Sequence, residues 1–538
     1  MASRTNTGCI TCRIRRIKCD EAKPQCNKCL RSKRICDGYL NSQVNMSRRQ
    51  LAETVRSLDV VGPVSRALAQ SPSSSNPISK LGMPEDSIFF DMFRHATVAS
   101  TCGVFPSSFW SETVMQLAHT EPAIWHATLA VGAMHRRTEI MERGTEGLDE
   151  QSLVRRAETH YGKALSLAQD LTDEPKVAAL ATVLVSAACL LGRWPEMQKH
   201  LMAGLKLVSS KQDPAPSLRV VESTLMKLDL QAMTFSESSS PYPYETTAIA
   251  FPVAKFLALP LIQGVSYEEL SAEIFGLLRT YMILDDDYLQ GSVAYGPWLT
   301  TQNLFLRRLI HWENRMASFE SKRPLRPSDE TTRLCIRLWH VTARILIKAT
   351  PIGGETRFDS LLGHFEYGIK TASAARKSIS DSRLSSLSLE PGLVAPLWSM
   401  IHRCRHRALR HAGLAILANA SRTEGMWSSH MTAPTIQAVV DVEEENLSPI
   451  ELKDYVSTIL SSPALELPWN IWSEPDLHIP TTLTWDDMPA IPEEHRVKDI
   501  LGLVGVNQSR VDIRLLMSTD PNVSSVKPGR VREVVVKF

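Results

Sequence analysis

The sequence contains no apolar stretch long enough to cross a lipid bilayer. Its longest run without a charged residue, residues 288–306, is interrupted by glycine, proline and amide side chains. The most apolar long run, Val177–Gly192, has only 16 residues between Lys176 and Arg193, whereas a spanning helix needs about 20. We therefore predict no membrane span, and we interpret this alanine-rich run as a buried helix of a helical bundle.

Motifs of the common enzyme classes are also missing. The chain has no glycine-rich phosphate-binding loop of the P-loop or dinucleotide type and no G-x-S-x-G nucleophile elbow. His364-Phe365-Glu366 has the H-x-E form of zinc deaminases, but the P-C-x-x-C that should follow is absent. His126 and His135 lie in a helical pattern whose apolar face explains them as core or surface residues. We expect no catalytic residue and predict that the chain is not an enzyme.

Acidic side chains are scarce near the N-terminus. Residues 1–50 carry 12 basic and 3 acidic residues, a net charge of +9, which leaves −7 on the other 488 residues. A small basic head on a mildly acidic body predicts that nucleic acid is bound by the head alone. The cysteines outside this head, which we interpret as reduced, buried thiols, are Cys102, Cys189, Cys335 and Cys404.

The head itself contains six cysteines in the pattern C-x2-C-x6-C-x6-C-x2-C-x6-C. They are Cys9, Cys12, Cys19, Cys26, Cys29 and Cys36. Zinc takes four ligands, so two zinc ions need eight sulfur positions, and six cysteines fill these only if two sulfurs bridge both ions. The pseudo-symmetry of the two halves makes Cys9 and Cys26 the predicted bridges. Cys12 and Cys19 then complete one ion, and the remaining two cysteines complete the other.

Six closely spaced cysteines have three other interpretations. A disulfide framework is typical of secreted domains, but residues 1–8, MASRTNTG, contain no apolar core of a secretory signal. A single four-cysteine zinc site would leave two spare thiols, and an iron–sulfur cluster does not fit because neither half has ferredoxin spacing. Two zinc ions on six thiolates carry −2, which reduces the +7 of the side chains in residues 9–36 to about +5.

The segment CITCRIRRIKCDEAKPQCNKCLRSKRIC, Cys9–Cys36, resembles the fungal-type zinc binuclear cluster transcription factors. The cysteine intervals, the basic run Arg13–Lys18 and the Lys23-Pro24 loop all match. The resemblance implies a DNA-binding module over residues 5–38, whose first short helix enters the major groove and reads a CGG triplet. By position, Arg15 and Arg16 are the expected base contacts, because a guanidinium can bridge O6 and N7 of one guanine.

Other basic residues of the module are better placed for phosphates, which position a protein on DNA without specifying sequence. These are Arg13, Lys18, Lys28 and Arg31. The family often has lysine where this chain has its base-reading arginines, a difference that changes reach. The expected function is that of a zinc-dependent, sequence-specific regulator of RNA polymerase II transcription in the nucleus, which binds double-stranded DNA and the transcription machinery or its co-regulators.

Residues 39–85 are predicted to be a linker. Ser47-Arg48-Arg49-Gln50 has the form of a capping box, and Leu51, Val55 and Leu58 follow at helical spacing before Gly62-Pro63 ends the pattern. This short amphipathic helix provides only about two heptads, fewer than the three or four that predict a coiled coil, so homodimerisation through it stays open.

Helical periodicity dominates residues 86–425. Thr120-Glu121-Pro122 is a helix start, and Ala157, Tyr161 and Ala164 repeat on one face of a later helix. The predicted fold is mainly α: a small two-zinc module joined by a linker to a large, all-α regulatory domain. Residues 109–137 resemble the start of the fungal-specific regulatory domain found with such clusters, which implies modulation of activity and, in some members, a small-molecule effector.

Residues 426–538 form an acidic C-terminal region. Between residues 441 and 494 there are 13 acidic residues and one basic residue, and Trp469, Trp472 and Trp485 lie among them. Aromatics kept solvated by acids are typical of an activation segment. We favour the alternative, an acidic surface that continues the helical domain with the tryptophans in its core. Weak alternation within residues 511–538 predicts a terminal strand or hairpin.

Two further functions remain alternatives. The cysteine-rich head would act as a protein-interaction module in a repressor or chromatin complex, or the helical body would act as a ligand sensor that the head delivers to DNA. The sequence names no target gene and does not distinguish activation from repression.

Overall fold

The computed structural model describes residues 19–20, 22, 26–31, 84–143, 150–209, 216–235, 266–289, 293–324, 326–349, 354–474, 477–486, 488, 490–507, 510–518 and 530–537. The chain divides into two compact units, residues 1–72 with 242–245, and residues 73–241 with 246–538. The described secondary structure of the first unit is a short helix, α2 (Asn27–Arg31). The amphipathic helix expected after Ser47 lies outside the described residues.

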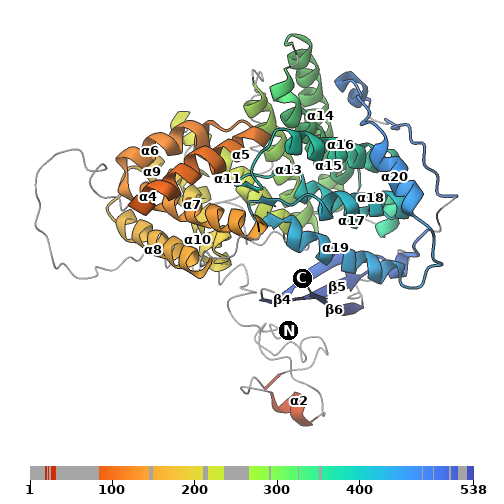
Figure 1. The fold of residues 1–538 in the computed structure, drawn as a ribbon. Coiled ribbons are helices and arrows are strands. Elements are labelled where there is room, and N and C mark those ends of the chain that lie inside the picture. Colours follow the sequence, from red (N-terminus) through yellow and green to blue (C-terminus); the bar gives the residue numbers. More distant parts are fainter. Residues whose placement is uncertain are drawn as a thin grey trace, which may run out of the picture. The chain divides into compact units, whose positions relative to one another are not determined.

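The second unit is mainly helical, as predicted (Figure 1). Its first group of helices comprises α4 (Pro84–Met92), α5 (Val98–Val104), α6 (Val114–Thr120), α7 (Pro122–Arg143), α8 (Glu150–Ala168), α9 (Glu174–Leu190), α10 (Trp194–Ser209) and α11 (Pro216–Phe235). Two π-helical turns, Phe93–Thr97 and Phe109–Thr113, join the shorter helices. Helix α8 buries the predicted face of Ala157, Tyr161 and Ala164.

Helix α7 begins at Pro122, where the sequence predicted a start, and packs against α4 and α8. Gly132 permits the close approach of α4, because a Cβ atom at this position would collide with the backbone carbonyl of Phe89. The alanine-rich run forms α9, in which Ala178–Cys189 are all buried. The carboxylate of Asp173 caps it by accepting the Lys176 N–H at 3.1 Å. The predicted buried helix is therefore confirmed.

The second group of helices comprises α13 (Tyr267–Leu289), α14 (Tyr295–Ser321), α15 (Glu330–Lys348), α16 (Leu362–Asp381), α17 (Val394–Arg403), α18 (Arg407–Ala418), α19 (Ser429–Glu444) and α20 (Lys453–Ser461). Helix α15 is buried along most of its length and packs against α16. Residues 429–461 thus continue the helical body beyond residue 425, within the same compact unit.

In the described part of this unit, two small sheets accompany the helices. Strands β1 (Leu387–Ser388), β2 (Thr423–Glu424) and β3 (Trp427–Ser428) form one, and β4 (Val497–Asn507), β5 (Arg510–Met517) and β6 (Val531–Lys537) form an antiparallel sheet beside α19 (Figure 1). The hairpin of β5 and β6 confirms the predicted terminal strands, whereas β4 was not predicted.

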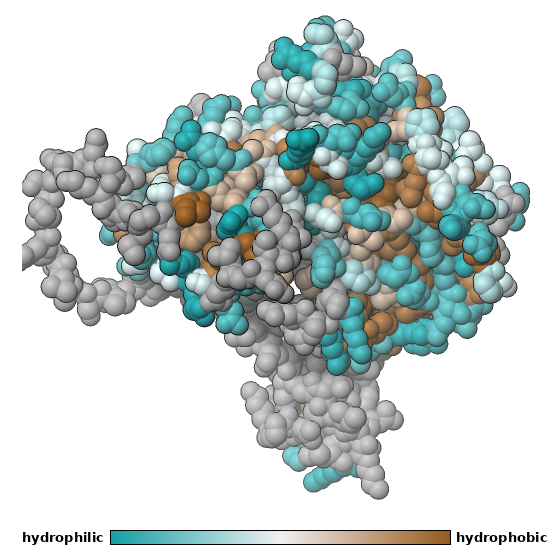
Figure 2. Space-filling view, viewed as in Figure 1, coloured by the Kyte–Doolittle hydropathy of each residue, from teal (hydrophilic) through white to brown (hydrophobic). Residues whose placement is uncertain are grey.

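The face of the helical body seen in Figure 2 is largely polar, with apolar patches between the polar side chains. Cys189, Cys335 and Cys404 are buried, as expected of structural thiols, and Cys102 is half-buried. Within the described ranges, no helix has the length and apolarity that a membrane span requires.

Candidate metal centre and nucleic-acid interface

The sulfurs of Cys19 and Cys26 and a carboxylate oxygen of Asp20 lie within 4.8 Å of one another. Sulfurs that share one tetrahedral zinc, with Zn–S distances of about 2.3 Å, are about 3.8 Å apart. The described thiols therefore fit one zinc ion, as the bridging scheme requires of this pair. Cys26 is buried and Cys19 half-buried, so both sulfurs are partly shielded from water.

Of the other four predicted zinc ligands, the structure describes only the backbone of Cys29. Cys29 lies in α2, three residues after Cys26, so this C-x2-C pair straddles the start of the helix. Cys9, Cys12 and Cys36 lie outside the described residues.

Asp20 caps α2, a role that the sequence reasoning missed. Its Oδ2 accepts the backbone N–H of Asn27 at 3.0 Å, and its Oδ1 accepts that of Lys28 at 3.5 Å. Donors at a helix start have no partner within the helix and favour a negative charge. Partial desolvation acts to raise the pKa of Asp20, but the hydrogen bonds from Asn27 and Lys28 outweigh it and lower the pKa. An aspartate six residues before a C-x2-C pair was the available signal.

Two of the predicted phosphate contacts are described, and both are exposed. Lys28 and Arg31 lie three residues apart on α2, so they share one side of the helix. They also lie in its last turn, where the helix dipole stabilises cations. Arg13, Lys18 and the predicted base contacts Arg15 and Arg16 lie outside the described residues.

The histidines of α7 are core residues. His126 Nδ1 lies 3.0 Å from Nδ1 of His160, and His135 lies between the hydroxyls of Thr97, at 2.7 Å, and Ser385, at 2.5 Å. Burial lowers the pKa of both His126 and His135 to about 4, so both are neutral near pH 7. Their ring nitrogens are used in hydrogen bonds within the protein, as expected of structural histidines.

The acidic C-terminal stretch contributes buried tryptophans to the helical body. Trp469 is 3% exposed, and its indole N–H donates to Glu320 at 2.7 Å. The guanidinium of Arg337 lies 4.5 Å from the centre of its ring. Trp472 is fully buried, and its backbone carbonyl accepts a hydrogen bond from Arg344 of α15.

The chain after Trp472 stays attached to α16. Glu366, the acid of the H-x-E sequence, pairs with Lys370 at 2.8 Å and accepts the Thr482 hydroxyl at 2.9 Å. Trp485 is half-buried, with its ring 5.4 Å from that of His406. Glu366 is thus used in structural contacts.

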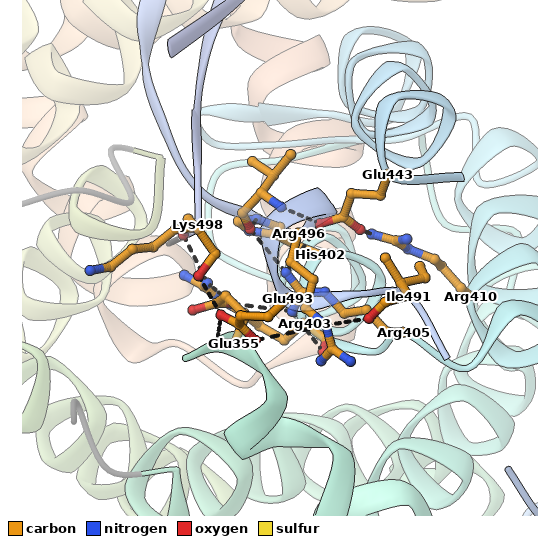
Figure 3. A network of polar contacts seen from close by, with 12 residues as sticks. Glu355, His402, Arg403, Arg405, Arg410, Glu443, Ile491, Glu493, Arg496 and Lys498 are labelled. Carbon is orange, nitrogen blue, oxygen red and sulfur yellow. Dashed lines mark hydrogen bonds and ion pairs between the residues drawn. The ribbon is translucent and has the colours of Figure 1, made fainter. Parts of the chain in front are cut away.

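A buried ionic network joins the C-terminal sheet to the helices (Figure 3). Glu355 Oε2 accepts a hydrogen bond from Arg403 at 2.7 Å and forms an ion pair with Arg405 at 3.1 Å. Arg405 also reaches Glu443 of α19 at 3.2 Å, and Glu443 accepts the Val497 N–H at the start of β4 at 2.5 Å. Burial acts to raise the pKa of Glu355, but the surrounding arginines lower it to about 2. The network therefore fixes β4 to the body.

Residues 7–45 match the family described as the fungal Zn(2)-Cys(6) binuclear cluster domain, and residues 88–269 match the fungal specific transcription factor domain. The aspercryptin biosynthesis cluster-specific transcription regulator of Emericella nidulans is 22% identical over 534 residues, which cover 80% of this chain and 85% of that protein.

Two proteins of Schizosaccharomyces pombe match more locally. An uncharacterized transcriptional regulatory protein is 36% identical over 138 residues, 25% of this chain and 24% of its own. The transcriptional regulatory protein moc3 is 60% identical over 43 residues, 8% of each chain. No solved structure matches the chain.

Proposed function

We propose that this chain, a DNA-binding transcription factor with a fungal Zn(2)-Cys(6) binuclear cluster domain and a fungal specific transcription factor domain, reads CGG-type sites in the major groove. The observation that carries the proposal is the six-cysteine pattern, which coincides with the cluster domain and in which Cys19 and Cys26 approach each other as ligands of one zinc ion would.

Two zinc ions are the cofactor of this domain type, and they supply the charge that draws six thiolates into one compact fold. In our scheme Cys9 and Cys26 bridge the ions, and Asp20 holds the start of α2 in place beside Cys26. Asp20 acts as a helix cap, because both of its carboxylate oxygens accept backbone N–H groups of α2.

DNA contacts are divided by role. Arg15 and Arg16 contact base edges, and the other basic residues of the module contact phosphates. The exposed positions of Lys28 and Arg31 on one side of α2 support their assignment to the backbone. With a net charge of +9 on residues 1–50, the head is attracted to DNA of any sequence, so specificity rests on the two arginines.

The direct test compares binding of the full-length, zinc-loaded chain to a CGG-containing duplex and to a scrambled duplex of equal length. We expect tighter binding to the CGG duplex and loss of binding to both duplexes after chelation. Equal affinity for the two duplexes in the presence of zinc would favour the interaction-module alternative instead.

We place the protein in the nucleus, where it regulates RNA polymerase II transcription through the transcription machinery or co-regulators. Mapping of bound chromosomal sites identifies its targets. The relative from Emericella nidulans is named for a biosynthetic gene cluster, so such clusters are the first loci to inspect.

We propose that the helical body regulates the activity of the head. If the body is a ligand sensor, it does so in response to a small-molecule effector. To find such an effector, the melting temperature of the full-length chain is measured with candidate metabolites, because a metabolite that binds the folded protein raises it. A fragment cut at residue 425 is unsuitable, because Trp469, Trp472 and Glu443 complete the core of the same unit.

A further inference from the structure

Strand β6 forms an edge of the C-terminal sheet. The sheet order is β4-β5-β6, so within the described residues the outer side of β6 has no neighbouring strand. Its register with β5 is regular from Arg510 opposite Lys537 to Leu516 opposite Val531. The other edge, β4, pairs with β5 through three register shifts, and such bulges hinder the addition of a further strand. Of the two edges, β6 is therefore the one suited to pairing.

The backbone groups on this edge can be assigned from the register. Met517 N–H donates to the Arg530 carbonyl at 3.0 Å, which makes this a hydrogen-bonded pair of the antiparallel ladder. Because such pairs alternate along the ladder, Arg532, Val534 and Val536 direct their backbone groups toward β5. The backbone groups of Val531, Glu533, Val535 and Lys537 point away from the sheet.

The two faces of β6 differ as well. Arg532 makes an ion pair with Glu445 at 2.6 Å, just beyond α19, so the even-numbered residues lie on the face toward the helices. The odd-numbered residues lie on the opposite face, where Val531 is 46% and Val535 50% exposed. The edge thus presents outward-pointing backbone groups together with exposed β-branched side chains, which favour strand pairing.

Charges on the exposed face are incompletely paired. Glu533 pairs with Arg514 of β5 at 2.9 Å. Lys537 lies opposite Arg510, a like charge, and makes no ion pair with any residue in the described ranges. An edge that carries an acid and, four residues later, a base with no ion-pair partner among the described residues is complementary to an antiparallel copy of itself.

We propose that β6 pairs with β6 of a second copy of this chain across a two-fold axis at Val535, so that the two sheets join into one. In this register Val535 meets Val535 of the second copy, and Glu533 of each copy lies opposite Lys537 of the other. Each Glu533 then lies between two cations, Arg514 and the lysine across the interface. The outward-pointing residues also become hydrogen-bonded pairs, as the ladder requires.

Charge selects this register. A two-fold axis at Glu533 would place that carboxylate opposite its own copy and would leave Lys537 beyond the pairing. The resulting contact is isologous and closes after two copies, so it yields a dimer and not a filament. A dimer carries two DNA-binding heads, and the contact itself does not depend on DNA or on the predicted base contacts.

The test is sedimentation velocity of the zinc-loaded, full-length chain without DNA, over a dilution series. We expect a dimer that dissociates to monomer. K537E and E533K each place like charges opposite one another twice in the dimer and should raise the dissociation constant about tenfold or more. The double swap E533K/K537E restores opposite charges and should restore the dimer. A chain that stays monomeric at all concentrations would overturn the proposal.

A second variant tests the backbone. Val535→Pro removes an outward-pointing N–H and leaves the ladder with β5 intact, so the monomer should keep its melting temperature while the dimer is lost. E158Q, in an exposed ion pair with Arg193, is the matched control and should sediment as the wild type does. If K537E and Val535→Pro both dimerise normally, the dimer contact lies elsewhere and the proposal is wrong. Each variant should bind a single CGG half-site as the wild type does, which separates this test from that of DNA binding.

Discussion

The indole ring of Trp472 meets the imidazole ring of His340 edge-on, with the ring centres 4.6 Å apart, in the core of the helical body. Both residues are fully buried, and Tyr367 packs on the same indole at 5.3 Å. Trp472 belongs to the most acidic, proline-rich part of the chain, yet the helices α15 and α16 supply its surroundings. The acidic stretch therefore supplies a residue of the core of the helical body.

Replacing Trp472 should therefore destabilise the protein. We expect Trp472→Ala to lower the free energy of unfolding by about 3–5 kcal/mol, the usual cost of deleting a large buried aromatic side chain. Chemical unfolding of the full-length chain, followed by circular dichroism, measures the loss. Trp485→Ala is the control and should have a smaller effect, because Trp485 is only half-buried.

A fusion experiment addresses the activation alternative for the same stretch. Residues 441–494 joined to an unrelated DNA-binding domain should leave a reporter silent, because in the structural interpretation this stretch is a part of the helical body and carries no co-activator site of its own. Strong reporter activity that disappears when Trp469, Trp472 and Trp485 are all changed to alanine would contradict the structural role.

Glu355 should make stability depend on pH. Its pKa is lowered to about 2 in the folded protein, from an ordinary value near 4.5, because Arg403, Arg405 and Arg357 surround it. Because the pKa of Glu355 is lower in the folded than in the unfolded chain, its ionised carboxylate stabilises the fold at pH values above the unfolded pKa. This contribution is lost as the pH falls from about 4.5 toward 2. E355Q should cost roughly 3 kcal/mol at pH 7 and progressively less in acid.

The measurement is the urea midpoint of both proteins between pH 7 and pH 3. Their unfolding free energies should converge as the pH decreases. E158Q, which removes one partner of an exposed ion pair, should change stability by less than about 1 kcal/mol. A constant difference between E355Q and wild type at all pH values would contradict the assignment.

Zinc binding should supply most of the folding free energy of the head, roughly 10 kcal/mol or more, because so short a segment has little core of its own. The full-length chain should contain two zinc ions, measured by elemental analysis at saturation. Cys26→Ala removes a proposed bridge and should disturb both ions, whereas Cys36→Ala should disturb primarily one. One zinc per wild-type chain would reject the bridged cluster.

Asp20 provides a separate test of the head. Asp20→Ala should weaken zinc binding in competition with a chelator while the stoichiometry stays at two, because a helix cap is lost and no ligand is removed. Asp20→Asn keeps an acceptor oxygen and should be less affected. The neighbouring Glu21→Ala is the control. Loss of a whole zinc equivalent in Asp20→Ala would identify Asp20 as a ligand and contradict the cap.

The sequence predicted features that depend on local pattern. The buried helix α9 follows from its apolar, alanine-rich composition. The start of α7 at Pro122 follows from helix-start residues that lie within a few positions of one another. The pairing of Glu355 with Arg403 and Arg405 was not predictable, because the partners are about 50 residues apart and share no period.

Strand β4 was missed for a related reason. Two of its three register shifts occur around Gly502 and Gly505, and these interrupt the alternation by which a strand is recognised. The burial of Trp469 and Trp472 was the favoured interpretation but not the sole one, because a proline-rich acidic stretch has the same composition whether it docks on a helical body or stays in solvent.

The proposed base contacts Arg15 and Arg16 should determine the specificity of the head. If Arg16 contacts a guanine through both of its terminal nitrogens, Arg16→Ala should cost about 1–3 kcal/mol on the CGG duplex and far less on scrambled DNA. Lys18→Ala, as a phosphate contact, should weaken both duplexes about equally and lower the salt slope by about one. The measurement is a titration of each variant on both duplexes at several salt concentrations. Arg15→Ala is the necessary companion, because the adjacent guanidinium can make the same contact. If neither arginine changes the ratio of specific to random affinity, the major-groove assignment is wrong for this chain.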